Sequence, residues 1–177
     1  MWVHCISKKK IEVLLEAYLQ AYKANPEIYD LVVIGDGSER ESITNWIEQN
    51  GLKEKIQLTG AIFDEKILAC YFARAVACIS PDQAGLSVLK SMGYGVPYIT
   101  HKDAITGGEI FNISHNENGI LLKDFDELPA AILETKQEPL KYIKFGEKAA
   151  AHYRNHRTVQ QMVQGFLDAI EYVATKK

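Results

Sequence analysis

With 177 residues, the chain is long enough to bury a hydrophobic core and short enough for one domain with at most a small appendage. Hydrophobic residues make up 47% of the sequence and charged residues 24%, which is typical of a soluble globular protein. The 20 basic and 23 acidic side chains give a net charge of −3, which argues against a nucleic-acid partner, because phosphate binding favours a basic surplus.

Short apolar runs alternate with amphipathic stretches along the chain and predict the strands of a sheet. The run at residues 31–34 is continuously apolar, which is typical of a parallel strand buried on both faces. The expected strands, in chain order, are residues 2–6, 31–34, 55–59, 76–80, 97–100 and 119–122.

Helices are expected between these strands. Apolar residues recur at helical spacing from Ile11 until Pro26 ends the helix, and a capping box at residues 38–41 and a cap at Asp64 mark the next two starts. A helix at about residues 85–94 follows, and the chain after Leu122 is helical. This alternation predicts an α/β fold: a Rossmann-like, doubly wound parallel sheet of about six strands with helices on both faces and a helical C-terminus.

The last expected helix, from Thr158 to about Val173, has a long apolar stripe. Packing of this stripe against the sheet is the expected role, as for most amphipathic helices, although it could also reach across to another domain. The stripe consists of Val159, Met162, Val163, Phe166, Ile170 and Val173.

The cysteines and histidines give no sign of a metal site. Cys5, Cys70 and Cys78 lack Cys-x-x-Cys spacing, and reduced, buried thiols in a cytosolic protein explain them best. His152 and His156 lie four apart on a helix, but no glutamate follows His152, so we predict no metal. Because no apolar run reaches membrane-span length and no signal-peptide stretch is present, the expected location is the cytoplasm.

In a doubly wound sheet, ligands bind beyond the carboxyl ends of the strands, so the candidate site lies in the loops that follow them. Gly35-Asp36-Gly37 begins like a dinucleotide-binding fingerprint, but Arg40 stands where the third glycine belongs. The sequence leaves open a plain tight turn or a turn near a ligand. His101, after the fifth expected strand, could lie at the site or be a partly buried structural residue.

The loop from Ser80 to Leu86 runs directly into a helix and is the strongest candidate. Free amides at a helix start, with Gly85 permitting close approach, would bind a diphosphate. Asp82 could meet a sugar hydroxyl or simply cap the helix. Lys90, further along, is an exposed surface lysine on spacing alone, or a positive charge near a nucleotide if its side chain faces the site.

The order and spacing of these segments resemble the C-terminal domain of GT-B-fold glycosyltransferases, specifically the large retaining family called family 4 or glycosyl transferases group 1. The resemblance implies that residues 1–177 form a single nucleotide-sugar-binding domain, the C-terminal half of an enzyme whose N-terminal acceptor domain is absent from this chain. Its segments are KKIEVLLEA (9–17), LVVIGDGSER (31–40), IQLTG (56–60) and, most densely, SPDQAGLSVLKSMGYGVPYIT (80–100).

The resemblance also implies roles for individual residues. The backbone amides of Gly85 and Leu86, and a lysine at the position of Lys9, would contact the donor diphosphate. The loop at residues 61–63, with Ile62 at its centre, would border the base. Gly35 and Gly37 complete the candidate nucleotide-binding set.

Two family glutamates, one near the transferred sugar and one on the ribose diol, correspond here to other residues. The first is Asp82, which is therefore the candidate catalytic residue. The second is Lys90, a reversal of charge, and a lysine has only hydrogen-bond donors to offer a ribose. Val3 stands where the family has an arginine. The motif resembles that of a bacterial polysaccharide-type branch without the second glutamate.

The implied function is the donor-binding half of a retaining hexosyltransferase in surface polysaccharide or lipopolysaccharide biosynthesis. The donor would be a UDP- or GDP-linked sugar, and the acceptor a saccharide or a lipid-linked saccharide, with no metal or other cofactor. The isolated domain would be inactive, and any membrane association, at the inner face, would come through the absent half. The alternatives are half of a nucleotide-sugar epimerase, or a non-catalytic nucleotide-binding or regulatory module, which Lys90 favours.

Overall fold

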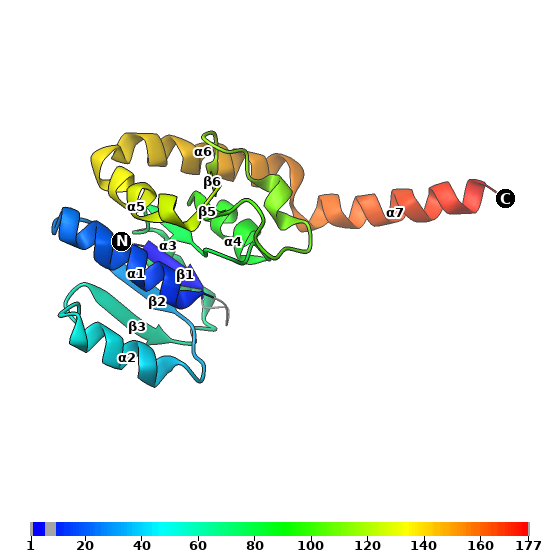
Figure 1. The fold of residues 1–177 in the computed structure, drawn as a ribbon. Helices are drawn as coiled ribbons and strands as arrows, with labels where there is room; N and C mark the ends of the chain where they lie inside the picture. The colour runs from blue at the N-terminus through cyan, green and yellow to red at the C-terminus, as the bar shows by residue number, and fades with distance from the viewer. Residues whose placement is uncertain (1, 6–9, 177) are drawn as a thin grey trace.

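The computed structural model describes residues 2–5 and 10–176 of the chain. Among them, parallel strands form a six-stranded sheet in the order β3-β2-β1-β4-β5-β6 (Figure 1). The α/β class, the parallel pairing and the helical C-terminus are thus confirmed. The strands are β1 (Trp2–Cys5), β2 (Leu31–Ile34), β3 (Ile56–Gly60), β4 (Ala77–Ile79), β5 (Tyr98–His101) and β6 (Gly119–Leu122).

The helices begin close to where the sequence predicts, with one local difference. Asp64 caps α3 as expected, because its Oδ1 accepts a hydrogen bond of 2.7 Å from the Lys66 amide. The capping box at residues 38–41 is wrong: the Arg40 amide donates to the Gly37 carbonyl and closes a turn, so the helix starts after Ser38 without a side-chain cap. The helices are α1 (Ile11–Ala24), α2 (Arg40–Gln49), α3 (Glu65–Phe72), α4 (Ser87–Gly93), α5 (Leu128–Gln137), α6 (Pro139–His156) and α7 (Val159–Thr175), with 3₁₀ turns η1 (Glu109–Asn112) and η2 (Phe125–Glu127).

The core lies on both faces of the sheet. In β2, Leu31 and Val33 belong to a cluster with α1, α2 and α5, whereas Val32 and Ile34 belong to a cluster with α3, α4 and η1. This alternation is what a strand buried on both faces requires. Cys78 is buried as predicted, but the prediction is wrong for Cys70, which is exposed on α3.

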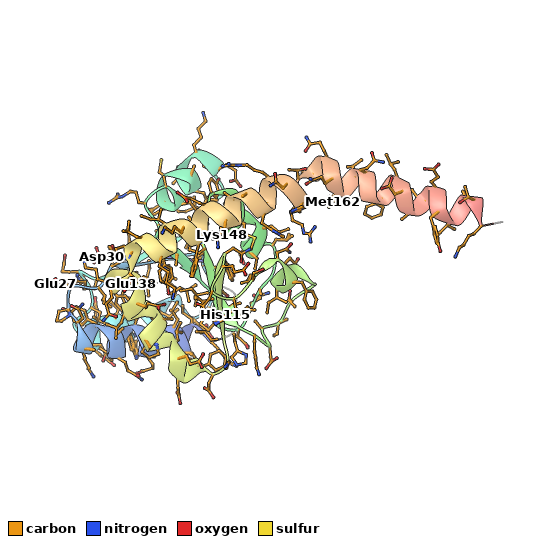
Figure 2. The ribbon with its side chains drawn as sticks, turned by 90° about the horizontal axis from the view of Figure 1, so that it is seen from above. Glu27, Asp30, His115, Glu138, Lys148 and Met162 are labelled. Carbon is orange, nitrogen blue, oxygen red and sulfur yellow. The ribbon has the colours of Figure 1, made fainter. Side chains whose placement is uncertain are left out.

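The terminal helix α7 leaves the body of the domain (Figure 1), and Met162 marks the place of departure in Figure 2. The expected packing of its stripe against the sheet is wrong: Phe166 is 69% exposed and Ile170 is 63% exposed. Thr158 starts the helix with a true capping box that includes Gln161, so the chain begins a new helix instead of extending α6. Across the described residues, no helix has the length and apolar character needed to cross a bilayer.

Asn112 holds the joint between α6 and α7. Its buried Oδ1 accepts from Arg157 Nε, and His152 Nε2 lies 3.2 Å from the same oxygen. Burial, followed by the charges of Arg157 and His156, lowers the pKa of His152 below its usual 6.5. The folded protein therefore favours the neutral imidazole at this joint.

We predict that this histidine makes the domain less stable as the solution is acidified. Above pH 6.5 the imidazole is neutral in both states, whereas below it the unfolded chain binds a proton that the folded chain resists, so stability falls as pH drops from 6.5 toward the folded pKa. Melting temperatures measured at about pH 7.5 and 5.5 should differ less in His152→Gln than in the unchanged protein. An identical difference in both proteins would contradict this assignment.

Candidate functional site

The strand order reverses between β1 and β4, which are neighbours in the middle of the sheet. α1, which follows β1, packs in one core cluster, and α4, which follows β4, packs in the other. We call the carboxyl ends of β1 and β4 the switch point. In open α/β sheets this is where ligands bind.

The loop from Ser80 to Leu86 lies at the switch point and is fixed by its neighbours. The amides of Ser80 and Ala84 donate to carbonyls of β5 and of Ile105, and the Ile105 amide donates to the Asp82 carbonyl at 2.9 Å. The fully buried Tyr98 places its hydroxyl 3.1 Å from the Gln83 carbonyl. The same hydroxyl lies 2.7 Å from Ser87 Oγ at the start of α4. The loop is therefore held in place by hydrogen bonds to β5, to Ile105 and to Ser87.

Asp82 forms an ion pair that the sequence did not predict. Lys10 Nζ lies 3.2 Å from Asp82 Oδ1, and the Asp82 side chain is only 15% exposed. The same ammonium lies 4.1 Å from the ring centroid of Phe125. Lys10 is the last of three consecutive lysines. The sequence alone does not show that Lys10 is one whose side chain reaches the loop.

The ring of His101 has a structural role, which is one of its two sequence-based alternatives. Its Nδ1 accepts from the Asp103 amide at 3.1 Å, so Nε2 carries the proton and donates to the Lys123 carbonyl at 2.9 Å. Its ring stacks on Phe125 with centroids 4.8 Å apart. Both ring nitrogens are thus occupied in joining β5 to the segment after β6.

The glycines after β2 form a turn beside the end of β3. Gly35 has φ 144°, a conformation that favours glycine, and its amide donates to the Gly60 carbonyl at 2.9 Å. The Gly37 amide donates to Asp36 Oδ1, and both glycines line a small hollow of about 50 Å³ with Arg40. This geometry is that of an ordinary tight turn. The turn also lies at the carboxyl edge of the sheet, where loops that contact a ligand lie.

The loop after β3 divides its apolar residues between the core and solvent. Ile62 is half-buried and packs against the core cluster of α3 and α4. Phe63, the next residue, is 90% exposed. The loop therefore presents an aromatic ring at the carboxyl edge while Ile62 anchors it.

The positive charge of Lys90, on α4, is balanced by an acidic side chain. Its Nζ donates to Glu65 Oε1 at 2.8 Å, and the Tyr94 hydroxyl donates to Glu65 Oε2 at 2.9 Å. These two bonds, that from Lys90 first, lower the pKa of the Glu65 carboxyl. A groove of about 480 Å³ runs from this cluster past Tyr153 to Met162 on α7. The sequence analysis did not identify Glu65 as a site residue. The feature that could have indicated it is its position directly after Asp64, the cap of α3.

The structure therefore groups the candidate residues in three places along one edge of the sheet. The first is the loop with Asp82, Gly85 and Leu86, the second is the turn and loop after β2 and β3, and the third is the groove with Lys90. Lys9 lies outside the described residues. In the part of the chain that the structure describes, no three His, Cys, Asp or Glu side chains are grouped as metal ligands would be.

Comparison with known proteins identifies a family and a curated relative. The family model for glycosyl transferases group 1 matches residues 2–138. The exopolysaccharide phosphotransferase SCO2592 of Streptomyces coelicolor is 29% identical over 151 residues. That match covers 81% of this chain but 15% of the relative, so the chain spans a small part of the relative's length.

Solved structures share the fold at low sequence identity. TarM of S. aureus, in a complex with fondaparinux, α-GlcNAc-glycerol and UDP, is 19% identical with a TM-score of 0.81, over 94% of this chain and 34% of TarM. HepE of Anabaena, with UDP, is 20% identical with a TM-score of 0.78, over 97% and 48%. The C-terminal domain of LpcC from Francisella tularensis is 19% identical with a TM-score of 0.73, over 89% and 85%.

Proposed function

The chain belongs to the glycosyl transferases group 1 family, and we propose that it is the donor-binding half of an enzyme that transfers a sugar from a nucleoside diphosphate sugar to an acceptor. The observation that carries the proposal is the preformed loop from Ser80 to Leu86 at the switch point. A role in surface polysaccharide assembly fits the word exopolysaccharide in the name of the Streptomyces relative. A saccharide or lipid-linked acceptor, and lipopolysaccharide as the other product class, are further parts of the proposal.

We infer that the sheet is a doubly wound nucleotide-binding sheet and that residues 1–177 act as one domain. The strand order β3-β2-β1-β4-β5-β6 and the core clusters on both faces support this inference. The donor half needs an acceptor-binding partner domain, N-terminal in the whole protein. Alone, the donor half is expected to be inactive, because the acceptor would have no site.

At the site, the donor diphosphate would lie against the amides of Gly85 and Leu86, with Asp82 near the transferred sugar. The start of α4 is open to a ligand: Leu86 is 75% exposed, and no atom lies within 4 Å of the place where a Cβ on Gly85 would be. Lys9 would be a further contact of the diphosphate. In the intact enzyme, amides and basic side chains would stabilise the departing diphosphate, with no metal or other cofactor required.

The base and ribose would extend along the edge of the sheet toward β2 and β3. Ile62 anchors the loop proposed to border the base, and Gly35 and Gly37 form the neighbouring turn. Lys90 would lie beside the ribose, where Glu65 neutralises its charge and offers carboxylate oxygens that a lysine lacks. UDP in the TarM and HepE complexes supports a uridine nucleotide as the first candidate, with GDP as the second.

Retention of anomeric configuration and a cytoplasmic location, at the inner face of the membrane through the partner domain, are further parts of the proposal. The rival within enzymes is half of a nucleotide-sugar epimerase, which requires acid and base groups at the site. His101 does not supply one, because both of its ring nitrogens are occupied. The other rival is a non-catalytic nucleotide-binding or regulatory module.

Calorimetric titration of the domain with UDP, GDP and their sugar conjugates tests the proposal. We expect one of the two nucleotides to bind at micromolar to low millimolar concentration and adenosine diphosphate to bind more weakly. A sugar conjugate should compete with its own nucleotide for the same site. The absence of binding to every nucleotide at millimolar concentration would contradict donor binding and favour a module that lost it.

The exposed stripe on α7 should affect the two-domain enzyme and not this domain. Phe166→Ser with Ile170→Ser is expected to change the unfolding free energy of the domain by less than about 0.5 kcal/mol, because both side chains face solvent. In the whole enzyme the same change should lower the transfer rate, because we propose that α7 packs on the acceptor domain. Gln160→Ser, a polar change on the same helix, is the control. Equal rates in all three enzymes would contradict this role.

A further inference from the structure

Tyr98, the first residue of β5, is a core tyrosine whose hydroxyl group reaches the loop before α4. The residue is 0% exposed and packs in the core cluster with α3, α4 and η1. A hydroxyl group at this depth needs hydrogen-bond partners, because burying it unpaired is costly. Its partners include the Gln83 carbonyl, at 3.1 Å, and Ser87 Oγ, at 2.7 Å.

These two partners lie on either side of the loop segment proposed to bind the diphosphate. Gly85 and Leu86 stand between Gln83 and Ser87 in the sequence. Hydrogen bonds to the segment after β5 hold the part of the loop that precedes Gly85. The Tyr98 hydroxyl also holds the residue that follows Leu86, so one oxygen atom joins both ends of the segment to β5.

The direction of these hydrogen bonds follows from their chemistry. A carbonyl group has no proton, so the Tyr98 hydroxyl donates its single proton to the Gln83 carbonyl. The bond to Ser87 must then run the other way, with the serine hydroxyl as the donor. Ser87 therefore uses its proton toward the core and has none left to donate to a phosphate. Phosphate binding at this loop then depends on backbone amides, and so on how the segment is placed.

We propose that Tyr98 is a positioning residue of the donor site. Its hydroxyl group fixes the two ends of the segment, Gln83 and Ser87, and thereby places the amides of the residues between them for the donor diphosphate. Such amides bind an anion most effectively when they are held in the required geometry before the ligand arrives. The identity of the ligand rests on the proposed function, whereas the hydrogen bonds of Tyr98 belong to the chain itself.

Tyr98→Phe removes the hydroxyl group and keeps the ring, and Tyr142→Phe is its matched control. Tyr142 is also 0% exposed, and its hydroxyl donates to Glu134 Oε2 at 2.9 Å. It lies on α6 and lines a groove at the edge of the sheet opposite the loop. Each change removes a buried hydrogen bond, so both should lower the melting temperature by about 2–6 °C.

Amide hydrogen exchange, measured by NMR without a ligand, reports on the loop itself. The amides of Ala84 and Val88 each donate a hydrogen bond of 2.9 Å to a backbone carbonyl. In Tyr98→Phe both amides should exchange about tenfold faster, because the loop opens more often. In Tyr142→Phe their rates should stay within about twofold of the unchanged chain.

Titration with UDP and with inorganic pyrophosphate measures the consequence for binding. Tyr98→Phe should weaken binding of both probes about threefold to tenfold, and Tyr142→Phe should leave it unchanged. Ser87→Ala, at a half-buried position, should weaken it about twofold, because the bond between Tyr98 and Gln83 remains. Tyr98→Phe combined with Ser87→Ala should bind like Tyr98→Phe alone, since both changes break one chain of hydrogen bonds.

Each outcome supports or overturns the inference. Unchanged exchange of the Ala84 and Val88 amides in Tyr98→Phe, or equal binding by Tyr98→Phe and Tyr142→Phe, would overturn it. Faster exchange in Tyr98→Phe, when the unchanged chain binds neither UDP nor pyrophosphate, would support the hold of Tyr98 on the loop and contradict the proposed donor. If Tyr98→Phe does not fold, faster exchange of the Val88 amide in Ser87→Ala supports the inference, and an unchanged rate overturns it.

Discussion

Gly146→Ala is expected to destabilise the domain by about 3 kcal/mol or more. Gly146 lies within α6, and a Cβ on it would be 2.1 Å from the Gly95 carbonyl oxygen and 3.1 Å from the Gly95 carbonyl carbon. These are backbone atoms, which cannot rotate away as a side chain can. Gly95 also has φ 72°, so its own conformation is restricted to glycine-like geometry. The helix must move off the segment before β5, which would open the core beneath it.

Gly165→Ala is the matched control for this change. Gly165 also lies within a helix, α7, but no atom is within 4 Å of its added Cβ. Alanine should therefore raise helix stability there by about 0.5–1 kcal/mol. Urea denaturation measures the first variant, and helical circular dichroism the second. A midpoint for Gly146→Ala equal to that of the unchanged chain would show that α6 does not pack as closely as described.

Asp82→Asn is expected to lower the rate of sugar transfer about 100-fold in the protein that carries both domains, because an amide replaces the charge proposed to act at the sugar. Nucleotide affinity should not fall, since the diphosphate contacts remain. Steady-state rates with a UDP- or GDP-linked sugar measure this effect.

Asp103→Asn is the control for Asp82→Asn. Asp103 is an exposed carboxylate on the loop after β5, and its side chain pairs weakly with Lys102 at 4.0 Å. Its transfer rate should stay within about twofold of the unchanged enzyme. An Asp82→Asn enzyme with an unchanged rate would remove Asp82 from the catalytic step.

Much of the fold could be predicted because burial on two faces leaves a clear mark on the sequence. The continuous apolar run at Leu31–Ile34 and the short run at Gly119–Leu122 have the same bounds in the structure as in the prediction. Asp64 was predictable as a cap because a carboxylate directly before a helix can accept hydrogen bonds from the free amides of its first turn. In these cases residues close together in the sequence determine the local structure.

The two wrong predictions about helices have different causes. The stripe on α7 has the same period whether it faces the sheet or a partner, so the pattern could not show that α7 leaves the domain. The capping box after β2 failed because the same residues form a turn between Gly37 and Arg40, which moves the helix start. In the first case the deciding contact is distant in sequence, and in the second two local structures compete for the same residues.

The candidate site was predictable as loops but not as pairs of side chains. The loop from Ser80 to Leu86 follows from its place between a strand and a helix. The partners of its charged residues lie far away in sequence: Lys10 for Asp82, and Glu65 for Lys90. The sequence presents Lys90 as a cation without a partner, whereas in the structure Glu65 balances its charge.

Amide chemical shifts of the domain, followed by NMR during titration with UDP and GDP, show directly where a nucleotide binds. Saturable shifts are expected at the carboxyl edge, in Gly85, Leu86 and Gly35. None are expected in the groove of about 470 Å³ at the opposite edge, which Ile143 and Gly95 line. Saturable shifts confined to that opposite groove, or no shifts with either nucleotide at millimolar concentration, would contradict donor binding at the switch point.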